Sequence, residues 1–231
     1  FGGSVTAGYG STEPDKYSWR ALSGEWFKAN FPDADITTIN TAIGESGTYL
    51  GTYRAQKDVI QQKPDLLFVE YAINDRYKGI DQATAAMQYE TIIREVKRAL
   101  PNCDIVTLLV TDNEVKELYK GELYPTARGH EEIAKAYNIS TINVGQSLLD
   151  SMHNQSDKEE WAVYFMDVVH PTNAGYQRYY ECVEEYLRNS LLYTNFDNIK
   201  ESNTLPPVQS ESLLDGNRKE YIGEEMNECL V

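Results

Sequence analysis

The apolar run LLFVEYAI, at residues 66–73, is followed directly by the polar pair Asn74-Asp75. Nearly continuous apolar character of this length is typical of a strand that is covered on both faces of a parallel sheet. Ligands of open parallel sheets bind beyond the carboxyl ends of the strands, so a polar pair at this point lies where a functional site is expected. The segment therefore predicts both a class of fold and one part of a site.

Other strands and helices alternate along the chain on both sides of this run. Three more short apolar runs predict strands, at residues 36–43, 105–110 and 139–144. Apolar residues at helical spacing predict helices at residues 16–29, 49–62, 81–100, 130–137 and 172–192. This alternation predicts an α/β protein with a mostly parallel sheet.

The chain is strongly acidic, with 36 Asp and Glu against 21 Lys and Arg among 231 residues, a formal net charge of −15. Binding to nucleic acid or to an anionic membrane surface requires clustered basic residues, so we expect neither partner. No apolar run approaches the roughly 20 residues of a membrane span. No signal peptide is recognisable, which slightly favours a cytoplasmic location but leaves the compartment open.

The histidines and cysteines do not form a recognisable metal motif. The three His and three Cys are scattered, without an HExxH or CxxC pattern, so we expect no metal site. The cysteines, Cys103, Cys182 and Cys229, are expected to be free and partly buried thiols, with one disulfide plus a spare thiol as the alternative.

Glycine and polar residues follow the predicted strands or precede the last helix. The segments are GGSVTAGYG at residues 2–10, GESG at 44–47, Asn74-Asp75, and DVVHP at 167–171. Each segment alone is common in loops and helix caps. Their order and their shared place at one edge of the sheet make the set informative.

These segments together contain the groups that acyl transfer requires. A serine such as Ser4 becomes a nucleophile when a base such as His170 accepts its proton, and Asp167, three residues earlier, can orient that histidine. The backbone N–H groups of Ser4 and Gly44 and the side-chain amide of Asn74 can converge on an oxyanion. The residues therefore predict a Ser4-His170-Asp167 triad with an oxyanion hole.

The order and spacing of these blocks resemble the SGNH (GDSL-like) hydrolase superfamily over about residues 1 to 190. Residues 2–6 resemble its nucleophile block, Gly44 its glycine block, residues 72–75 its asparagine block, and residues 167–171 its final block. The resemblance implies a flavodoxin-like, three-layer α/β/α sandwich of about five mostly parallel strands. It also implies ester hydrolysis without a cofactor.

Two positions depart from the family pattern. Gly3 stands where the family usually has an aspartate before the serine, which questions the support of the loop more than catalysis. Ala72 stands where the family has a glycine, and its methyl group is expected to narrow the oxyanion side of the pocket. Neither change removes a catalytic group.

Other residues are interpreted as substrate contacts or as structural. Glu45, which follows the oxyanion glycine, and the rings of Tyr9 and Tyr49 are expected to bind substrate, the rings by facing a sugar. Glu70 lies inside an apolar strand and is expected to form an ion pair with Arg54 or Arg76.

The two remaining histidines are expected to have no role in the site. His130 starts a predicted helix far from every block, and His153 lies in a polar segment that indicates the surface.

The residues and the resemblance together predict a serine esterase acting on a short acyl ester, such as O-acetyl on a carbohydrate. The nucleophile block resembles that of bacterial carbohydrate O-acyl esterases, and the chain has no long apolar lid segment. The expected partner is a small-molecule or oligosaccharide ester, and the oligomeric state is open. The alternatives are a lysophospholipase or thioesterase on the same fold, or a carbohydrate-binding domain without turnover.

The chain divides into a hydrolase domain at residues 1–193 and an acidic, polar extension at residues 194–231. Ser4 follows only three residues, whereas a nucleophile at this place in the fold follows a central strand. We therefore expect the first strand to be truncated, with an apolar strand of about five residues before Phe1. The alternative, insertion of residues 204–208 into the sheet, is disfavoured because Pro206 and Pro207 cannot donate hydrogen bonds.

Overall fold

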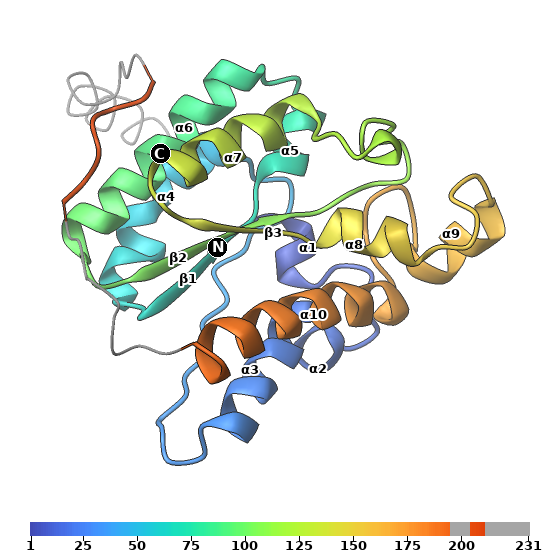
Figure 1. Cartoon of the computed structure of the whole chain (residues 1–231), viewed down its shortest axis with the longest axis horizontal. Helices are drawn as coiled ribbons and strands as arrows, with labels where there is room; N and C mark the ends of the chain where they lie inside the picture. Colours follow the sequence, from blue (N-terminus) through green and yellow to red (C-terminus); the bar gives the residue numbers. More distant parts are fainter. Residues whose placement is uncertain (195–203, 211–231) are drawn as a thin grey trace, which may run out of the picture.

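The computed structural model describes residues 1–194 and 204–210 and contains a parallel sheet at its centre (Figure 1). Among these residues the sheet has three strands in the order β1-β2-β3, which span Leu66–Val69, Asp104–Leu109 and Ser140–Asn143. Leu67 lies opposite Ile105, and Val106 lies opposite Ser140. The predicted α/β class and parallel sheet are confirmed.

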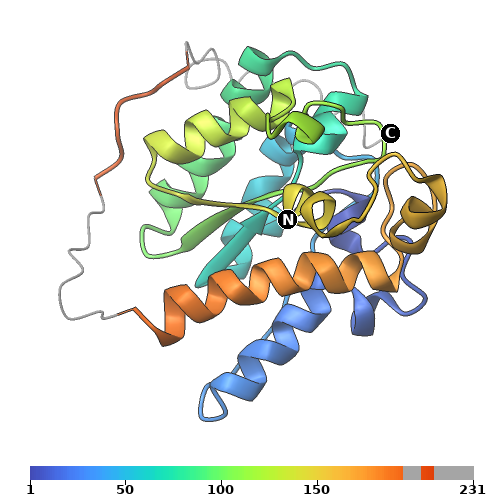
Figure 2. The same cartoon turned by 45° about the vertical axis from the view of Figure 1, so that its right-hand side comes forward.

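Helices cover both faces of this sheet. Figures 1 and 2 show α4 (Thr48–Asp58), α6 (Gln82–Ala99) and α7 (Pro125–Ala136) on one face, and α3 (Trp19–Asn30) and α10 (Asn173–Leu187) on the other. The hydrophobic core is divided in the same way. Leu67, Val69 and Ile105 belong to one buried cluster, whereas Val106 and Leu108 belong to the other. Alternate side chains of a strand point to opposite faces, so the strands need apolar residues at nearly every position.

Short elements complete the described chain. They are the helices α1 (Ser4–Ala7), α2 (Pro14–Tyr17), α5 (Ala72–Tyr77), α8 (Val144–Ser151) and α9 (Lys158–Tyr164), the 3₁₀ turns η1 (Ile60–Gln62) and η2 (Leu118–Lys120), and the π turn η3 (Arg188–Leu192). The predicted helix at 16–29 is divided at Ser18, whose hydroxyl caps α3 by accepting from the N–H of Ala21. The helix predicted at 130–137 begins earlier, at Pro125, a residue that favours the first turn.

The strand predicted at residues 36–43 is wrong, and the described sheet has three strands rather than about five. Ile39 and Ile43 are about half exposed. The place beside β1 is taken by residues 1–3, which contribute a single parallel bridge between Gly2 and Glu70. On its other side the carbonyl of Gly2 accepts hydrogen bonds from the N–H of Ile43 at 3.0 Å and from the hydroxyl of Ser46 at 3.3 Å. One bridging residue cannot support a continuous ladder for residues 36–43.

Residues 204–210 lie against α6 and α7 and do not enter the sheet. Glu90 is buried in α6 and accepts hydrogen bonds from the backbone N–H groups of Gln209 and Ser210, each at 2.7 Å. Arg94 donates to the carbonyl of Pro206 at 2.9 Å. The predicted boundary near residue 193 stays a prediction, because residues 195–203 and 211–231 lie outside the described residues.

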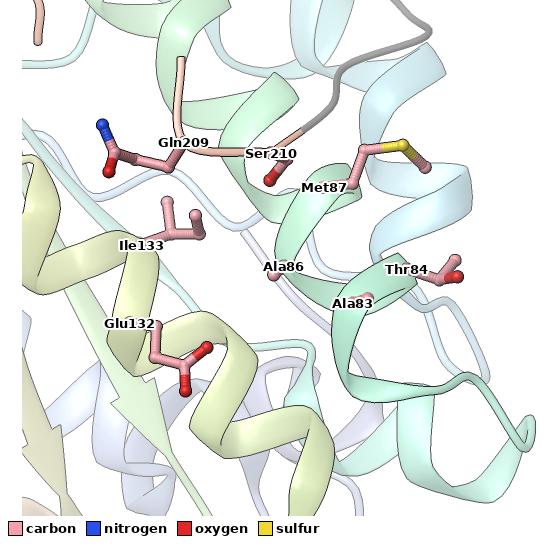
Figure 3. Close-up of a pocket in the computed structure, with 8 residues that line it drawn as sticks. All are labelled: Ala83, Thr84, Ala86, Met87, Glu132, Ile133, Gln209 and Ser210. Carbon is pink, nitrogen blue, oxygen red and sulfur yellow. The ribbon is translucent and has the colours of Figure 1, made fainter. Parts of the chain in front are cut away.

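A pocket of about 670 Å³ lies beside this segment (Figure 3). Its lining comes from α6, α7 and the segment itself: Ala83, Thr84, Ala86, Met87, Glu132, Ile133, Gln209 and Ser210. None of the predicted site residues lines it.

Candidate active site

Ser4 is the first residue of α1, a turn that begins where residues 1–3 pass the end of β1 (Figure 1). Gly8 ends the turn at φ 97°, in the left-handed region that favours glycine. A Cβ atom on Gly3 would lie only 2.2 Å from Oδ1 of Asn74. The departure from the family aspartate at position 3 therefore fits the position of Asn74, because a side chain there would displace the amide.

Ser4, His170 and Asp167 form a continuous line of hydrogen bonds. Nε2 of His170 lies 2.8 Å from Oγ of Ser4, and Nδ1 of His170 lies 2.7 Å from Oδ2 of Asp167. Burial alone would raise the pKa of Asp167, but hydrogen bonds from the ring and backbone of His170 and from the N–H of Val169 lower it overall. The carboxylate is therefore ionised at neutral pH, and it can accept a hydrogen bond from an N–H group of the imidazole.

The loop that carries His170 is held from several sides. The other oxygen of Asp167 accepts the backbone N–H groups of Val169 and His170, at 2.9 and 2.8 Å. The N–H of Asn113, in the loop after β2, donates to the carbonyl of Val168 at 3.0 Å. Gly10 passes so close to the loop that an added Cβ would lie 2.3 Å from the carbonyl oxygen of Pro171.

The three predicted oxyanion donors lie around Ser4. As the first residue of a helix, Ser4 has a backbone N–H without an acceptor inside that helix. An added Cβ on Gly44 would lie 3.8 Å from Cβ of Ser4, so the glycine loop borders the serine. Asn74, in α5, is placed beside Gly3, and its Oδ1 has no hydrogen-bond partner among the described residues.

Ala72 does not narrow this side of the site as expected. The residue is only 1% exposed, and its methyl group is packed in the hydrophobic core.

Of the three predicted substrate contacts, the structure brings only Tyr9 against the predicted triad. Tyr9 is 61% exposed, and its ring lies 5.6 Å from the ring of His170, tilted by 42°. Glu45 is exposed and follows Gly44 with φ 62°. Tyr49 is exposed on α4 and packs edge-to-face on Tyr53 at 5.2 Å.

The predicted ion pair of Glu70 is wrong. Arg54 pairs with Asp58, and Arg76 pairs with the buried Asp112, each at 2.6 Å. Glu70 instead accepts a hydrogen bond at 2.9 Å from the hydroxyl of Thr6 in the nucleophile turn. Burial raises the pKa of Glu70 to about 7, partly opposed by the Thr6 bond. The raised pKa favours the neutral carboxylic acid, which can be buried without a cation beside it.

His130 lies much closer to the site than its sequence position suggested. It is buried in α7, 3.0 Å from Oδ2 of Asp75, the neighbour of Asn74. The prediction that it is far from every block is wrong. The Asn74-Asp75 pair after an apolar run indicates a site, but no local pattern in the sequence predicts a contact between Asp75 and His130. His153 is exposed, as expected.

The structure identifies free thiols at Cys103 and Cys182, as predicted, whereas Cys229 lies outside the described residues. Within residues 1–194 and 204–210, no cluster of three or more His, Cys, Asp or Glu side chains is arranged to bind a metal. In the same part of the chain, no helix has the length and apolar character needed to cross a bilayer.

Known structures share this fold. A two-domain esterase active on acetylated mannans superposes with a TM-score of 0.76 at 22% identity, over 90% of this chain and 52% of that one. Axe2, an acetylxylan esterase from Geobacillus stearothermophilus, superposes with a TM-score of 0.64 at 18% identity, over 81% and 90% of the two chains. The chain thus spans about half the length of the two-domain esterase and nearly the length of Axe2.

Sequence comparison agrees with the fold. A curated arylesterase of Vibrio mimicus is 24% identical over 176 residues, which cover 71% of this chain and 83% of the relative. The family model described as GDSL-like lipase/acylhydrolase matches residues 1–178, a span that contains every block discussed above. The protein therefore belongs to the GDSL-like lipase/acylhydrolase family, a family of carboxylic ester hydrolases.

Proposed function

We propose that this chain is a serine esterase that uses Ser4, His170 and Asp167 as its catalytic triad. One observation supports it above all: the hydrogen-bonded line from Asp167 through the ring of His170 to Ser4, with distances of 2.7 and 2.8 Å. In this arrangement Nδ1 donates to the carboxylate, so Nε2 is free to accept the serine proton.

The reaction proceeds in two steps through an acyl-enzyme. Oγ of Ser4 attacks the ester carbonyl while Nε2 of His170 takes the serine proton. The resulting imidazolium, stabilised by Asp167, gives that proton to the departing alkoxide as the C–O bond breaks. Water then attacks the acyl-serine with His170 as base, and the protonated histidine returns the proton to Ser4 as the acid leaves.

The oxyanion that forms in each step is bound by three donors. These are the N–H groups of Ser4 and Gly44 and the amide of Asn74, which enter from α1, the glycine loop and α5. Donors that are already fixed need no reorganisation when charge develops, which lowers the barrier.

The substrate we propose is a short acyl ester of a carbohydrate, with O-acetyl as the leading case. Two proteins of the same fold act on acetylated mannans and acetylxylan. The exposed ring of Tyr9 beside His170 offers an aromatic face on which a sugar can stack near the leaving oxygen. Glu45 and Tyr49, exposed beyond the glycine loop, supply a carboxylate and a second ring for hydroxyl groups and sugar faces.

The test is hydrolysis of p-nitrophenyl acetate, butyrate and octanoate beside acetylated xylo- and manno-oligosaccharides. We expect acetate to be cleaved fastest among the p-nitrophenyl esters and acetate to be released from the oligosaccharides. Ser4→Ala is the matched control, because it removes one oxygen from a partly buried side chain that is not part of either core cluster. It should lower turnover by about 10⁴-fold or more.

Other outcomes separate the alternatives. Faster cleavage of octanoate than acetate favours a lysophospholipase or thioesterase. A folded wild-type chain that forms no covalent adduct with a fluorophosphonate probe is a binding domain. Substantial activity in folded Ser4→Ala refutes the nucleophile.

A further inference from the structure

A buried polar cluster lies behind the oxyanion hole, and the triad does not use it. Its members are Asp75, Thr48, His130 and Gln88, and their exposed fractions are 0%, 0%, 1% and 8%. They come from α5, α4, α7 and α6, so the cluster connects four helices. Buried polar groups are costly unless they are hydrogen-bonded, which makes the position of each member specific.

Asp75 caps the start of α4 from a different helix. Its Oδ1 accepts the backbone N–H of Thr48 at 2.8 Å, and its Oδ2 lies 2.9 Å from the Thr48 hydroxyl. The first N–H groups of a helix lack partners inside the helix and favour a carboxylate. Gly47, the N-cap of α4, offers no side chain for this purpose, and an added Cβ there would lie 2.4 Å from Oδ1 of Asp75. The cap therefore depends on both the carboxylate and the glycine.

The carboxyl group of Asp75 is itself held on its far side. Nε2 of His130 lies 3.0 Å from Oδ2, and the imidazole stacks on the ring of Tyr89 at 4.4 Å, only 10° from parallel. The Thr48 hydroxyl also lies 2.7 Å from Oε1 of Gln88. These contacts fix the orientation of the Asp75 carboxylate, and through Thr48 they fix the start of α4 relative to α5.

The elements that Asp75 joins are those that carry two of the three oxyanion donors. Asn74 is the preceding residue in α5, and Gly44 lies in the loop that leads directly into α4. We infer that Asp75 is a positioning residue that sets the separation of Gly44 and Asn74 and so holds the oxyanion hole in its active geometry. The inference rests on the proposed function and adds the residue that assembles this part of the site.

Another contact anchors the glycine loop to residues 1–3. The N–H of Ile43 donates to the carbonyl of Gly2 at 3.0 Å, and the Ser46 hydroxyl donates to the carbonyl of Ile43 at 2.6 Å. This contact fixes the loop relative to Ser4 but not relative to α5. The Asp75 contact, by contrast, connects the start of α4 directly with the helix of Asn74.

The test is a double-mutant cycle between Asp75→Asn and Asn74→Ala, with p-nitrophenyl acetate as substrate. An amide at position 75 cannot accept at both of its terminal atoms, so it cannot keep the bond from the Thr48 N–H and act as an acceptor toward the Thr48 hydroxyl and His130 at the same time. We expect kcat to fall roughly 10- to 100-fold with little change in KM, since a misplacement of ~1 Å can cost about 10²-fold. In the Asn74→Ala background the same substitution should cost far less, because the donor that it misplaces is already absent. The acid limb of the pH profile of kcat/KM should not move.

Glu90→Gln is the matched control. Glu90 is also a buried carboxylate that accepts two backbone N–H groups, but it binds residues 209 and 210 on the outer side of α6. It should lower thermal stability and leave kcat unchanged. If Asp75→Asn does not fold, Gly47→Ala tests the same contact with the carboxylate retained, and it should lower kcat in the same way.

The outcomes distinguish this inference from the proposed function. Equal fold losses from Asp75→Asn in the two backgrounds, or full kcat in Asp75→Asn or in Gly47→Ala, overturn the positioning role alone. A wild-type chain without turnover or a fluorophosphonate adduct overturns the proposed function and the inference together.

Discussion

At the scale of single residues, the two hydrogen bonds of the proposed triad have different origins. Asp167 and His170 are three residues apart, and the turn between them is closed by two backbone N–H bonds to the same carboxylate. The bond between His170 and Ser4 joins residues 166 positions apart. The first contact is local and could be inferred from spacing, whereas the second depends on the whole fold.

Asp167→Asn should reduce turnover less completely than His170→Ala. The asparagine keeps the shape of the turn but can present an N–H group to Nδ1, which favours the wrong tautomer of the imidazole. Loss of His170 removes the base, at a cost of about 10⁴- to 10⁶-fold in kcat. Steady-state kinetics on p-nitrophenyl acetate will compare the two. An Asp167→Asn enzyme equal to wild type would mean that another group orients His170.

Gly3→Ala should lower kcat although the backbone at this position suits alanine, with φ −90° and ψ −156°. The added methyl group would lie 2.2 Å from Oδ1 of Asn74, so the amide must move. Loss of one oxyanion donor costs roughly 10²- to 10³-fold, which sets the upper limit of the effect. Kinetics combined with thermal unfolding will check this. A folded variant with unchanged kcat would show that Asn74 does not stabilise the oxyanion.

At the scale of elements, α10 fixes the nucleophile turn. The hydroxyl of the buried Tyr176 lies 3.0 Å from the carbonyl oxygen of Val5 and 2.6 Å from that of Tyr9. The helix thereby holds both ends of the turn that carries Ser4. Asn173, at the start of the same helix, accepts from the hydroxyl of Ser11 at 2.9 Å.

Tyr176→Phe should therefore lower both stability and activity. The loss of a buried hydrogen bond costs about 1 kcal/mol of unfolding free energy, and a looser turn lowers kcat. Tyr179→Phe is the control, because Tyr179 is equally buried on α10 and its hydroxyl has only longer contacts, of 3.4 and 3.5 Å, with Thr111. Denaturant unfolding and kcat will be measured for both. Equal kcat in the two variants would argue against a role for Tyr176 in placing Ser4.

The end of β1 contributes a titratable group beneath the nucleophile. Burial raises the pKa of Glu70 to about 7, so between about pH 4.5 and 7 the folded protein binds more protons than the unfolded chain. The protonated Glu70 side chain therefore contributes fully to the free energy of unfolding below pH 4.5. This contribution is lost as the pH rises through about 7.

Glu70→Gln should remove this pH dependence, since the amide keeps an acceptor for Thr6 and carries no charge. We expect the variant to be more stable than wild type at pH 8, by up to about 3 kcal/mol, and to match it near pH 4.5. Denaturant unfolding across this range will test the result. An unchanged slope in Glu70→Gln would assign the pH dependence to other groups.

At the scale of the whole molecule, the two core clusters hold the layers together, and the net charge sets the sign of the long-range electrostatic potential. The strands supply apolar side chains to both faces of the sheet, and helices cover each face. The surface consequently carries most of the charged residues, and the sum over the chain is −15. A potential of this sign repels anionic substrates at long range.

The rate with an anionic ester should therefore depend on salt, whereas the rate with a neutral ester should not. Raising the ionic strength from 0.01 to 0.15 M shortens the Debye length from about 30 to about 8 Å. We expect kcat/KM for p-nitrophenyl hemisuccinate to rise with salt and kcat/KM for p-nitrophenyl acetate to stay nearly constant. Equal salt dependence of both esters would contradict a repulsive field at the site.

Local patterns in the chain predict the α/β class and the order of the proposed site segments. The apolar run at residues 66–73 indicates a buried strand, although the strand itself is Leu66–Val69 and α5 begins at Ala72. The Asp167-His170 spacing closes its own turn. The partners of the buried polar groups, in contrast, follow from how distant elements pack against one another. Glu70 could have paired with Arg54 or Arg76, but both arginines lie against other carboxylates. Residues 36–43 have the composition of a strand, yet a strand also needs a neighbour, and within residues 1–194 and 204–210 the bridging residue Gly2 meets them only at Ile43. Asp75 and His130 are 55 residues apart and meet because two helices cross there. Such contacts depend on the distance between elements, which no local pattern encodes.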